Sequence, residues 1–185
     1  NVQNGVNAYK KSNADYIIAI GGGSSIDTAK AIGIIINNPE FEDVRSLEGV
    51  APTKNKCVPI IAVPTTAGTA AEVTINYVVT DEERHVKMVM VDKNSLATVT
   101  VNDPELMVEK PASLTAATGM DALTHAIETI VTPGAYPVSD ATALAAVKII
   151  FDYLPRTVEN GHDIEAREQM VYAVFLGGIA FSNAG

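Results

Sequence analysis

The sequence predicts an α/β domain with a parallel sheet, followed by an all-helical domain. Up to about residue 104, short β-branched apolar runs alternate with helical segments, which is the pattern of a parallel sheet. After Pro104 the strand signals stop and helical segments follow one another. Two loops rich in small and hydroxyl residues come directly after predicted strands, where parallel sheets bind ligands. We therefore predict domains at residues 1–104 and 105–185, with a binding site at the loops of the first.

The first domain opens with a helix and a buried strand. Val2, Val6 and Tyr9 recur at helical spacing, so residues 1–12 are expected to form a helix that faces a core. The apolar, β-branched run Tyr16–Ile20 predicts a strand buried in the sheet.

The strand runs into three glycines, Gly21–Gly23, and a second helix is expected to begin at this turn. Ser24 or Ser25 would cap that helix, with Asp27 in its first turn. A helix N-terminus above a glycine floor binds phosphate, which would make the turn a pyrophosphate site. The alternative is an ordinary tight turn, since the run GGGS has neither the GxGxxG spacing nor the lysine of a Walker A loop. The residues by themselves leave both interpretations open.

The remaining strands surround the second loop. Val58–Val63 predicts a buried strand that leads into Pro64–Glu72, the second loop of small and hydroxyl residues. Two β-rich runs, 74–80 and 87–91, flank a charged turn and predict a hairpin. A short strand is expected at residues 97–101. Two interpretations of Lys87 are open: it is a lysine on an edge strand with no binding role, or its side chain contacts a ribose or phosphate.

Three helices are expected in the second domain. The first covers residues 112–132 with an interruption near Gly119, the second covers 138–154 and ends at Pro155, and the third covers 164–180. Spacing places five apolar side chains on the inner face of the second helix: Leu144, Val147, Ile150, Phe151 and Leu154.

Composition and charge exclude several functional classes. Of the 185 residues, 47% are hydrophobic and 19% are charged, so a packed core is expected and disorder is not. The net charge of −9 disfavours nucleic acid and anionic membranes as partners. No apolar run reaches the length of about 20 residues that spans a bilayer. Because Cys57 is the single cysteine, an internal disulfide is excluded, and we expect Cys57 to be a buried thiol. The low cysteine content fits a reducing compartment, so we expect the protein in the cytoplasm.

One pair of residues has the spacing of metal ligands. In the run MDALTHAIETI, Asp121 and His125 are four residues apart and share one helix face. An imidazole and a carboxylate suit Fe(II), Zn or Mn, which need further ligands. The alternatives are a surface Asp–His pair or a hydrogen-bonded core histidine. The other histidines, His85 and His162, read as surface residues in turns.

Four motifs in this order carry a resemblance to a known family: GGGSSIDTAKAIG, PTTAGTAAEVT, DPEL and GMDALTHAIE. Together they resemble the iron-containing (group III) alcohol dehydrogenases, whose fold is dehydroquinate synthase-like. The resemblance implies that residues 1–104 are the C-terminal part of a dinucleotide-binding domain. It implies that residues 105–185 are the N-terminal part of a helical metal-binding domain, so both domains are incomplete and the chain looks like an internal fragment.

The resemblance also implies roles for individual residues. The cofactor site would comprise Gly22, Gly23, Ser24, Asp27, Thr65, Thr66, Thr69, Thr74 and Lys87. Asn76 and Phe181 would border the substrate, and Asp121 and His125 would be two of four ligands of Fe²⁺ or Zn²⁺. The family's other two ligands are histidines that come after the segment matching Phe181 to Gly185.

The activity implied by the resemblance is hydride transfer between NAD, with NADP left open, and a small alcohol or aldehyde such as 1,2-propanediol or lactaldehyde. Family members form dimers or larger assemblies, so a homo-oligomer is expected. Two alternatives remain at this point. One is a non-catalytic fragment that keeps partial cofactor binding, and the other is a non-redox relative with the dehydroquinate synthase fold.

Overall fold

The computed structural model describes residues 1–184, which form two compact units. The first unit contains Asn1–Val63 and Ile75–Val101, and the second contains Pro64–Thr74 and the chain from Asn102 onward. The first is an α/β unit and the second is helical, which confirms the predicted fold class.

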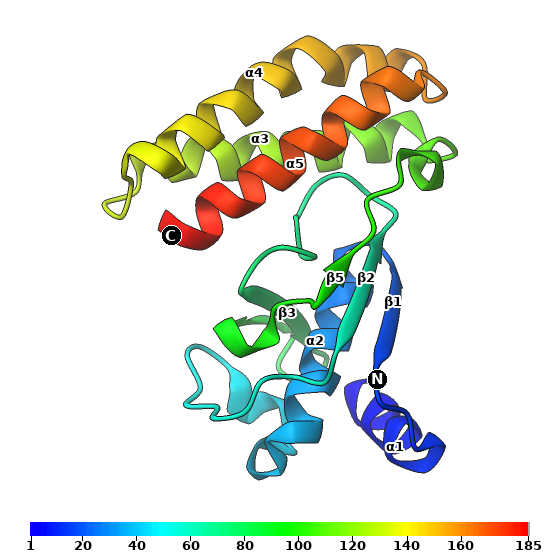
Figure 1. The fold of residues 1–185 in the computed structure, drawn as a ribbon, viewed down its shortest axis with the longest axis vertical. Coiled ribbons are helices and arrows are strands. Elements are labelled where there is room, and N and C mark those ends of the chain that lie inside the picture. Colours follow the sequence, from blue (N-terminus) through cyan, green and yellow to red (C-terminus); the bar gives the residue numbers. More distant parts are fainter. Residues whose placement is uncertain (185) are drawn as a thin grey trace. The chain divides into compact units, whose positions relative to one another are not determined.

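The sheet of the first unit has three strands in the order β1-β2-β5 (Figure 1). These are β1 Ile17–Gly21, β2 Ile60–Pro64 and β5 Val99–Thr100. β2 and β5 run parallel, with Ile61 opposite Val99. The prediction that the first strand is buried is wrong for one of its faces. Successive side chains point to opposite faces, and Ala19 is buried whereas Ile18 and Ile20 are 53% and 64% exposed.

Two helices, α1 Val2–Ser12 and α2 Gly23–Asn37, pack against each other, and α2 also contacts β1 and the strand β3, Asn76–Asp81. The predicted serine cap is wrong: Gly22 is the N-cap of α2, and no side chain caps it. The helix begins at Gly23, directly after the strand, so Ser24 and Ser25 already lie inside it. For the same reason Asp27 lies beyond the first turn, where it is buried.

The predicted hairpin is confirmed as β3 Asn76–Asp81 and β4 Val86–Val91, which pair antiparallel with Val78 opposite Val89. Three short 3₁₀ helices, Pro39–Phe41, Val44–Leu47 and Lys93–Ser95, lie in the connections of this unit. Cys57 is buried, as predicted, and burial raises the pKa of its thiol.

Asp81 connects the hairpin to the 3₁₀ helix Val44–Leu47, which contains Arg45. Its carboxylate, 2% exposed, accepts hydrogen bonds from Arg45 Nε at 2.8 Å and from Arg84 Nε at 2.7 Å. The backbone N–H groups of Glu83 and Arg84 donate to the same carboxylate at 2.9 and 3.2 Å. These donors hold the pKa of Asp81 well below its usual range.

The helical unit contains α3 Ala112–Val131, α4 Pro137–Glu159 and α5 Ile164–Ala184, each in contact with the other two (Figure 1). The 3₁₀ helix Pro104–Met107 precedes them and contacts α5. Their core includes Ala122, Leu123, Ile150, Leu154, Met170, Ala173 and Val174. No helix among residues 1–184 is both long and apolar enough to cross a bilayer.

Three predictions about these helices are wrong. α3 is continuous at Gly119, because the glycine leaves room for Leu154, whose Cδ1 would lie 2.3 Å from a Cβ there. α4 continues through Pro155 to Glu159, since proline removes a single helical hydrogen bond and the flanking Leu154 is held in the core. Leu144 and Phe151 are 57% and 66% exposed, so they do not line the inner face.

We expect Asp81→Asn to lower the free energy of unfolding of the full-length protein at neutral pH. The folded pKa lies below the ordinary value of 3.8, so the stabilisation is complete above about pH 4 and is lost as the pH falls through the folded pKa. Urea unfolding should therefore separate the variant from wild type at neutral pH and bring the two together in acid. Asp152→Asn is the control, since its exposed ion pair with Lys148 should contribute little. A difference that does not change with pH would contradict this role of Asp81.

Candidate functional site

The glycine turn, Gly21–Gly23, joins β1 to α2 without a side-chain cap. Gly21 has φ +148°, and a Cβ there would lie 2.4 Å from Ser25 Oγ, so only glycine fits. The N–H groups of Ser25 and Ile26 donate to Gly22 O at 3.0 and 3.4 Å, which closes the first turn. The N–H groups that open a helix lack intrahelical partners, so this turn has the chemistry of a phosphate site.

A buried carboxyl and a buried amine lie one turn further along α2. Lys30 is 0% exposed, and its Nζ donates to the backbone oxygen of Asn76 at 2.9 Å. Burial raises the pKa of Asp27 to about 6, opposed by the charge of Lys30 and by the N–H of Val78. Both residues therefore join α2 to β3, and Lys30 fixes the backbone at Asn76. Sequence reasoning missed Lys30; the available signal was its position three residues after Asp27, which places both side chains on one face of the helix.

The second predicted loop, Pro64–Glu72, lies within the segment Pro64–Thr74, which belongs to the helical unit and is here called the threonine loop. It lies close to two helices through small residues. A Cβ at Gly68 would lie 2.9 Å from Thr118 Cβ of α3, and one at Gly178 of α5 would lie 2.3 Å from Ala70 Cβ. Ala70 has φ 53°, a left-handed conformation that an alanine rarely adopts.

The predicted threonines of this loop differ in exposure. Thr65 and Thr66 are half-buried, Thr69 is exposed, and Thr74 is 1% exposed. The hydroxyl of Thr69 accepts from the N–H of Ala71 at 3.4 Å, so it contributes to the shape of the loop. Lys87, in the other unit, is exposed on β4 opposite Thr80.

The predicted metal ligands lie together on α3. His125 Nε2 is 3.6 Å from Asp121 Oδ1, and both side chains are partly exposed. Two donors, each about 2.1 Å from one metal ion, lie about 3–3.5 Å apart, so the pair fits two positions of one coordination shell. Among residues 1–184 no group of three or more His, Cys, Asp or Glu side chains is arranged to hold a metal.

Phe181, predicted to border the substrate, stacks on the His125 ring with centroids 4.6 Å apart and planes 15° apart. The structure thus brings Asp121, His125 and Phe181 together within the helical unit, from two different helices. Sequence spacing could not show this contact, because the two rings are 56 positions apart in the printed sequence. The stack fixes the plane of the imidazole and leaves its Nε2 on the side of Asp121.

Comparison with known families covers both units. Residues 1–104 match the family described as iron-containing alcohol dehydrogenase, and residues 115–185 match the C-terminal part of the Fe-containing alcohol dehydrogenase family. The chain belongs to the iron-containing alcohol dehydrogenase family. This confirms the resemblance inferred from the four sequence motifs.

Individual relatives agree with this assignment. Lactaldehyde reductase of Escherichia coli (strain K12) and NAD-dependent methanol dehydrogenase of Bacillus methanolicus are 53% and 52% identical to the chain over 184 residues. The solved structure of an alcohol dehydrogenase from Oenococcus oeni is 44% identical, with a TM-score of 0.94. Each match covers 100% of this chain and 48% of the relative, so the chain spans about half the length of these proteins.

The contact between the threonine loop and α5 predicts that alanine substitutions at the adjacent Gly177 and Gly178 have different effects on the free energy of unfolding. In the full-length protein we expect Gly178→Ala to cost about 1–3 kcal/mol in unfolding free energy, because the new Cβ overlaps Ala70. Gly177→Ala is the matched control, since its Cβ would meet nothing closer than 3.8 Å and should gain about 1 kcal/mol from helix propensity.

Adding Ala70→Gly to Gly178→Ala should restore most of the lost stability, because it removes the methyl group of the closest contact and suits the left-handed backbone. It leaves only the smaller overlap with Val73 Cγ2, which would lie 2.9 Å from the new Cβ. Urea unfolding of the four proteins, wild type included, measures these differences. Equal effects of the two alanine substitutions would show that the loop does not lie against Gly178.

Proposed function

We propose that the full-length protein is a metal-dependent oxidoreductase that transfers a hydride between NAD(P) and a small alcohol or aldehyde. The observation that carries this proposal is the Asp121–His125 donor pair with Phe181 stacked against it, in a chain of the iron-containing alcohol dehydrogenase family. The names of the relatives, a lactaldehyde reductase and an NAD-dependent methanol dehydrogenase, support short alcohols and aldehydes as substrates and NAD as the cofactor.

Asp121 and His125 would hold Fe²⁺ or Zn²⁺, together with the two further ligands implied by the family resemblance. When bound, such an ion supplies a Lewis acid for the substrate oxygen. The contribution of this chain is geometric. Both donors lie one turn apart on α3, and Phe181 restricts rotation of the His125 ring, so the imidazole needs little ordering when the ion binds.

The cofactor residues are proposed to act in two groups. Gly22, Gly23 and Ser24 would bind the pyrophosphate through the free N–H groups at the start of α2, with Asp27 nearby. Thr65, Thr66 and Thr69 would contact the nucleotide and its nicotinamide ribose. Thr74 and Lys87 would also line the cofactor site. The nicotinamide, when bound, supplies the redox chemistry, and the protein supplies orientation.

Asn76 and Phe181 would border the substrate. Lys30 holds the backbone of Asn76 through its carbonyl oxygen, so the amide side chain is not used for that anchor. A small polar side chain at this position suits lactaldehyde or 1,2-propanediol. We also propose a cytoplasmic homodimer or larger assembly, on the basis of the single cysteine and the family resemblance.

Loss of either predicted metal ligand should remove both the metal and the activity of the full-length protein. We expect Asp121→Asn and His125→Gln to reduce metal content and to lower NAD-dependent oxidation of 1,2-propanediol by more than about 100-fold, beyond the effect of losing a supporting residue. His162→Gln is the control, because His162 is 69% exposed in a surface turn.

Elemental analysis, NAD binding and turnover, measured together, separate the alternatives. Unchanged metal content in both ligand variants would refute the assignment of Asp121 and His125. Wild-type protein that binds NAD but carries no metal would indicate a non-catalytic binding protein. Metal-dependent turnover without net oxidation of the substrate would indicate a non-redox lyase.

The size of residue 76 should set the preference for substrate length. We expect Asn76→Ala to raise kcat/KM for longer alcohols relative to 1,2-propanediol, and Asn76→Phe to lower it, because one side chain enlarges and the other narrows the same space. Thr80→Ala, an exposed position on the same strand, is the control. An unchanged length preference in both variants would remove Asn76 from the substrate site.

A further inference from the structure

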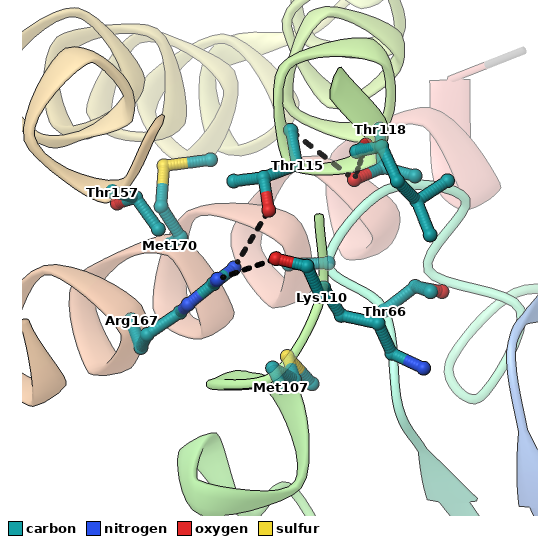
Figure 2. A pocket seen from close by; sticks show the side chains of 10 residues that line it. Thr66, Met107, Lys110, Thr115, Thr118, Thr157, Arg167 and Met170 are labelled. Carbon is teal, nitrogen blue, oxygen red and sulfur yellow. Dashed lines mark hydrogen bonds between the residues drawn. The ribbon is translucent and has the colours of Figure 1, made fainter. Parts of the chain in front are cut away.

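A buried arginine lies near the start of α5 in the helical unit. Arg167, in the first turns of α5, is 5% exposed and lines a small cavity of about 10 Å³. Figure 2 shows its guanidinium pointing toward Thr115 and the backbone of Lys110, with Thr66 of the threonine loop on the other side of Lys110 in this view. The cavity has room for about one water molecule.

The guanidinium joins three segments through neutral acceptors. Its Nε donates to Gly161 O at 2.9 Å, its Nη1 to Thr115 Oγ1 at 3.0 Å, and its Nη2 to Lys110 O at 3.5 Å. Burial lowers the pKa of Arg167, and no salt bridge to a carboxylate among residues 1–184 offsets that burial. A buried charge without an opposite charge is costly, so Arg167 adds little to stability by charge pairing. Its contribution is the fixed geometry of a planar fork of donors.

The hydrogen-bonded guanidinium of Arg167 lies next to the threonine loop. Thr115 is in the first turn of α3, and Thr118, less than one turn further on, lies against Gly68. Thr66 and Ala67 line the same cavity as Arg167. A shift of the first turn of α3 would therefore displace the surface on which the middle of the loop lies. Asp121 and His125 are farther along the same helix, about 9 Å and 15 Å from Thr115 at 1.5 Å per residue.

We propose that Arg167 is a positioning residue for the cofactor: through Thr115 it holds the first turn of α3, and thereby the threonine loop, where the loop meets the nicotinamide ribose. This inference rests on the proposed function, because it assigns to the loop the cofactor contacts proposed above. A Cβ at Gly161 would lie 3.0 Å from Arg167 Nη2 and 3.0 Å from Val108 O, so the glycine allows the fork to reach its acceptors.

The test compares Thr115→Val with Thr115→Ser in the full-length, metal-loaded protein. Valine keeps the shape of threonine but removes the acceptor of Arg167, whereas serine keeps the hydroxyl. We expect Thr115→Val to weaken NAD binding and raise KM for NAD about tenfold, with kcat and metal content within about twofold of wild type. Thr115→Ser should bind NAD as wild type does. Arg167→Met should reproduce the valine variant, and Arg156→Met, which removes an exposed arginine, is the control.

The outcomes distinguish a positioning role from a structural one. A lower melting temperature in Thr115→Val with unchanged affinity for NAD would overturn the proposal, as would a fall in kcat with unchanged KM. Should Arg167→Met not fold, the valine and serine variants decide. Failure of the wild-type protein to bind NAD would overturn the proposed function itself, whereas wild-type binding that Thr115→Val does not weaken would overturn this inference alone.

Discussion

The close contact between the threonine loop and two helices is the constraint on which the candidate site depends. Gly68 lies against Thr118 of α3, and Ala70 lies against Gly178 of α5, at separations that leave no room for an added methyl group. The loop follows β2 in sequence, yet it is part of the helical unit. Consequently the proposed nicotinamide contacts share one compact unit with Asp121, His125 and Phe181, and the pyrophosphate turn lies in the other unit.

Buried charge recurs next to both halves of the proposed cofactor site. In the α/β unit, Asp27 and Lys30 are buried below the glycine turn and join α2 to β3. In the helical unit, Arg167 is buried below the threonine loop with neutral acceptors. Burying a charge opposes folding unless hydrogen bonds compensate, so such groups are better suited to fixing geometry than to adding stability. Asp27, Lys30 and Arg167 would therefore restrict the conformations of the two loops that are proposed to bind the cofactor.

Much of the fold could be predicted because its signals are local. β-branched runs, glycines and helical spacing identified the parallel sheet, the hairpin and the three helices of the second unit. The errors concern helix continuity and helix orientation, which depend on tertiary packing. Gly119 and Pro155 look like breaks in sequence, but each is accommodated in a continuous helix because Leu154 is held in the core. Leu144 and Phe151 have the right spacing for an inner face but lie outside it, since spacing does not fix which way a helix is turned.

The sequence by itself determined the fold class and the family, because their signals are local runs and ordered motifs. It also placed Asp121 and His125, the two residues proposed as metal ligands, next to each other, because residues four apart are neighbours on one helix face. Only the tertiary structure decided that Phe181 stacks on His125, that Lys30 holds the backbone of Asn76, and that Arg167 supports the first turn of α3. These contacts join residues 46 to 56 positions apart, and the partner at such a separation is set by how the elements pack.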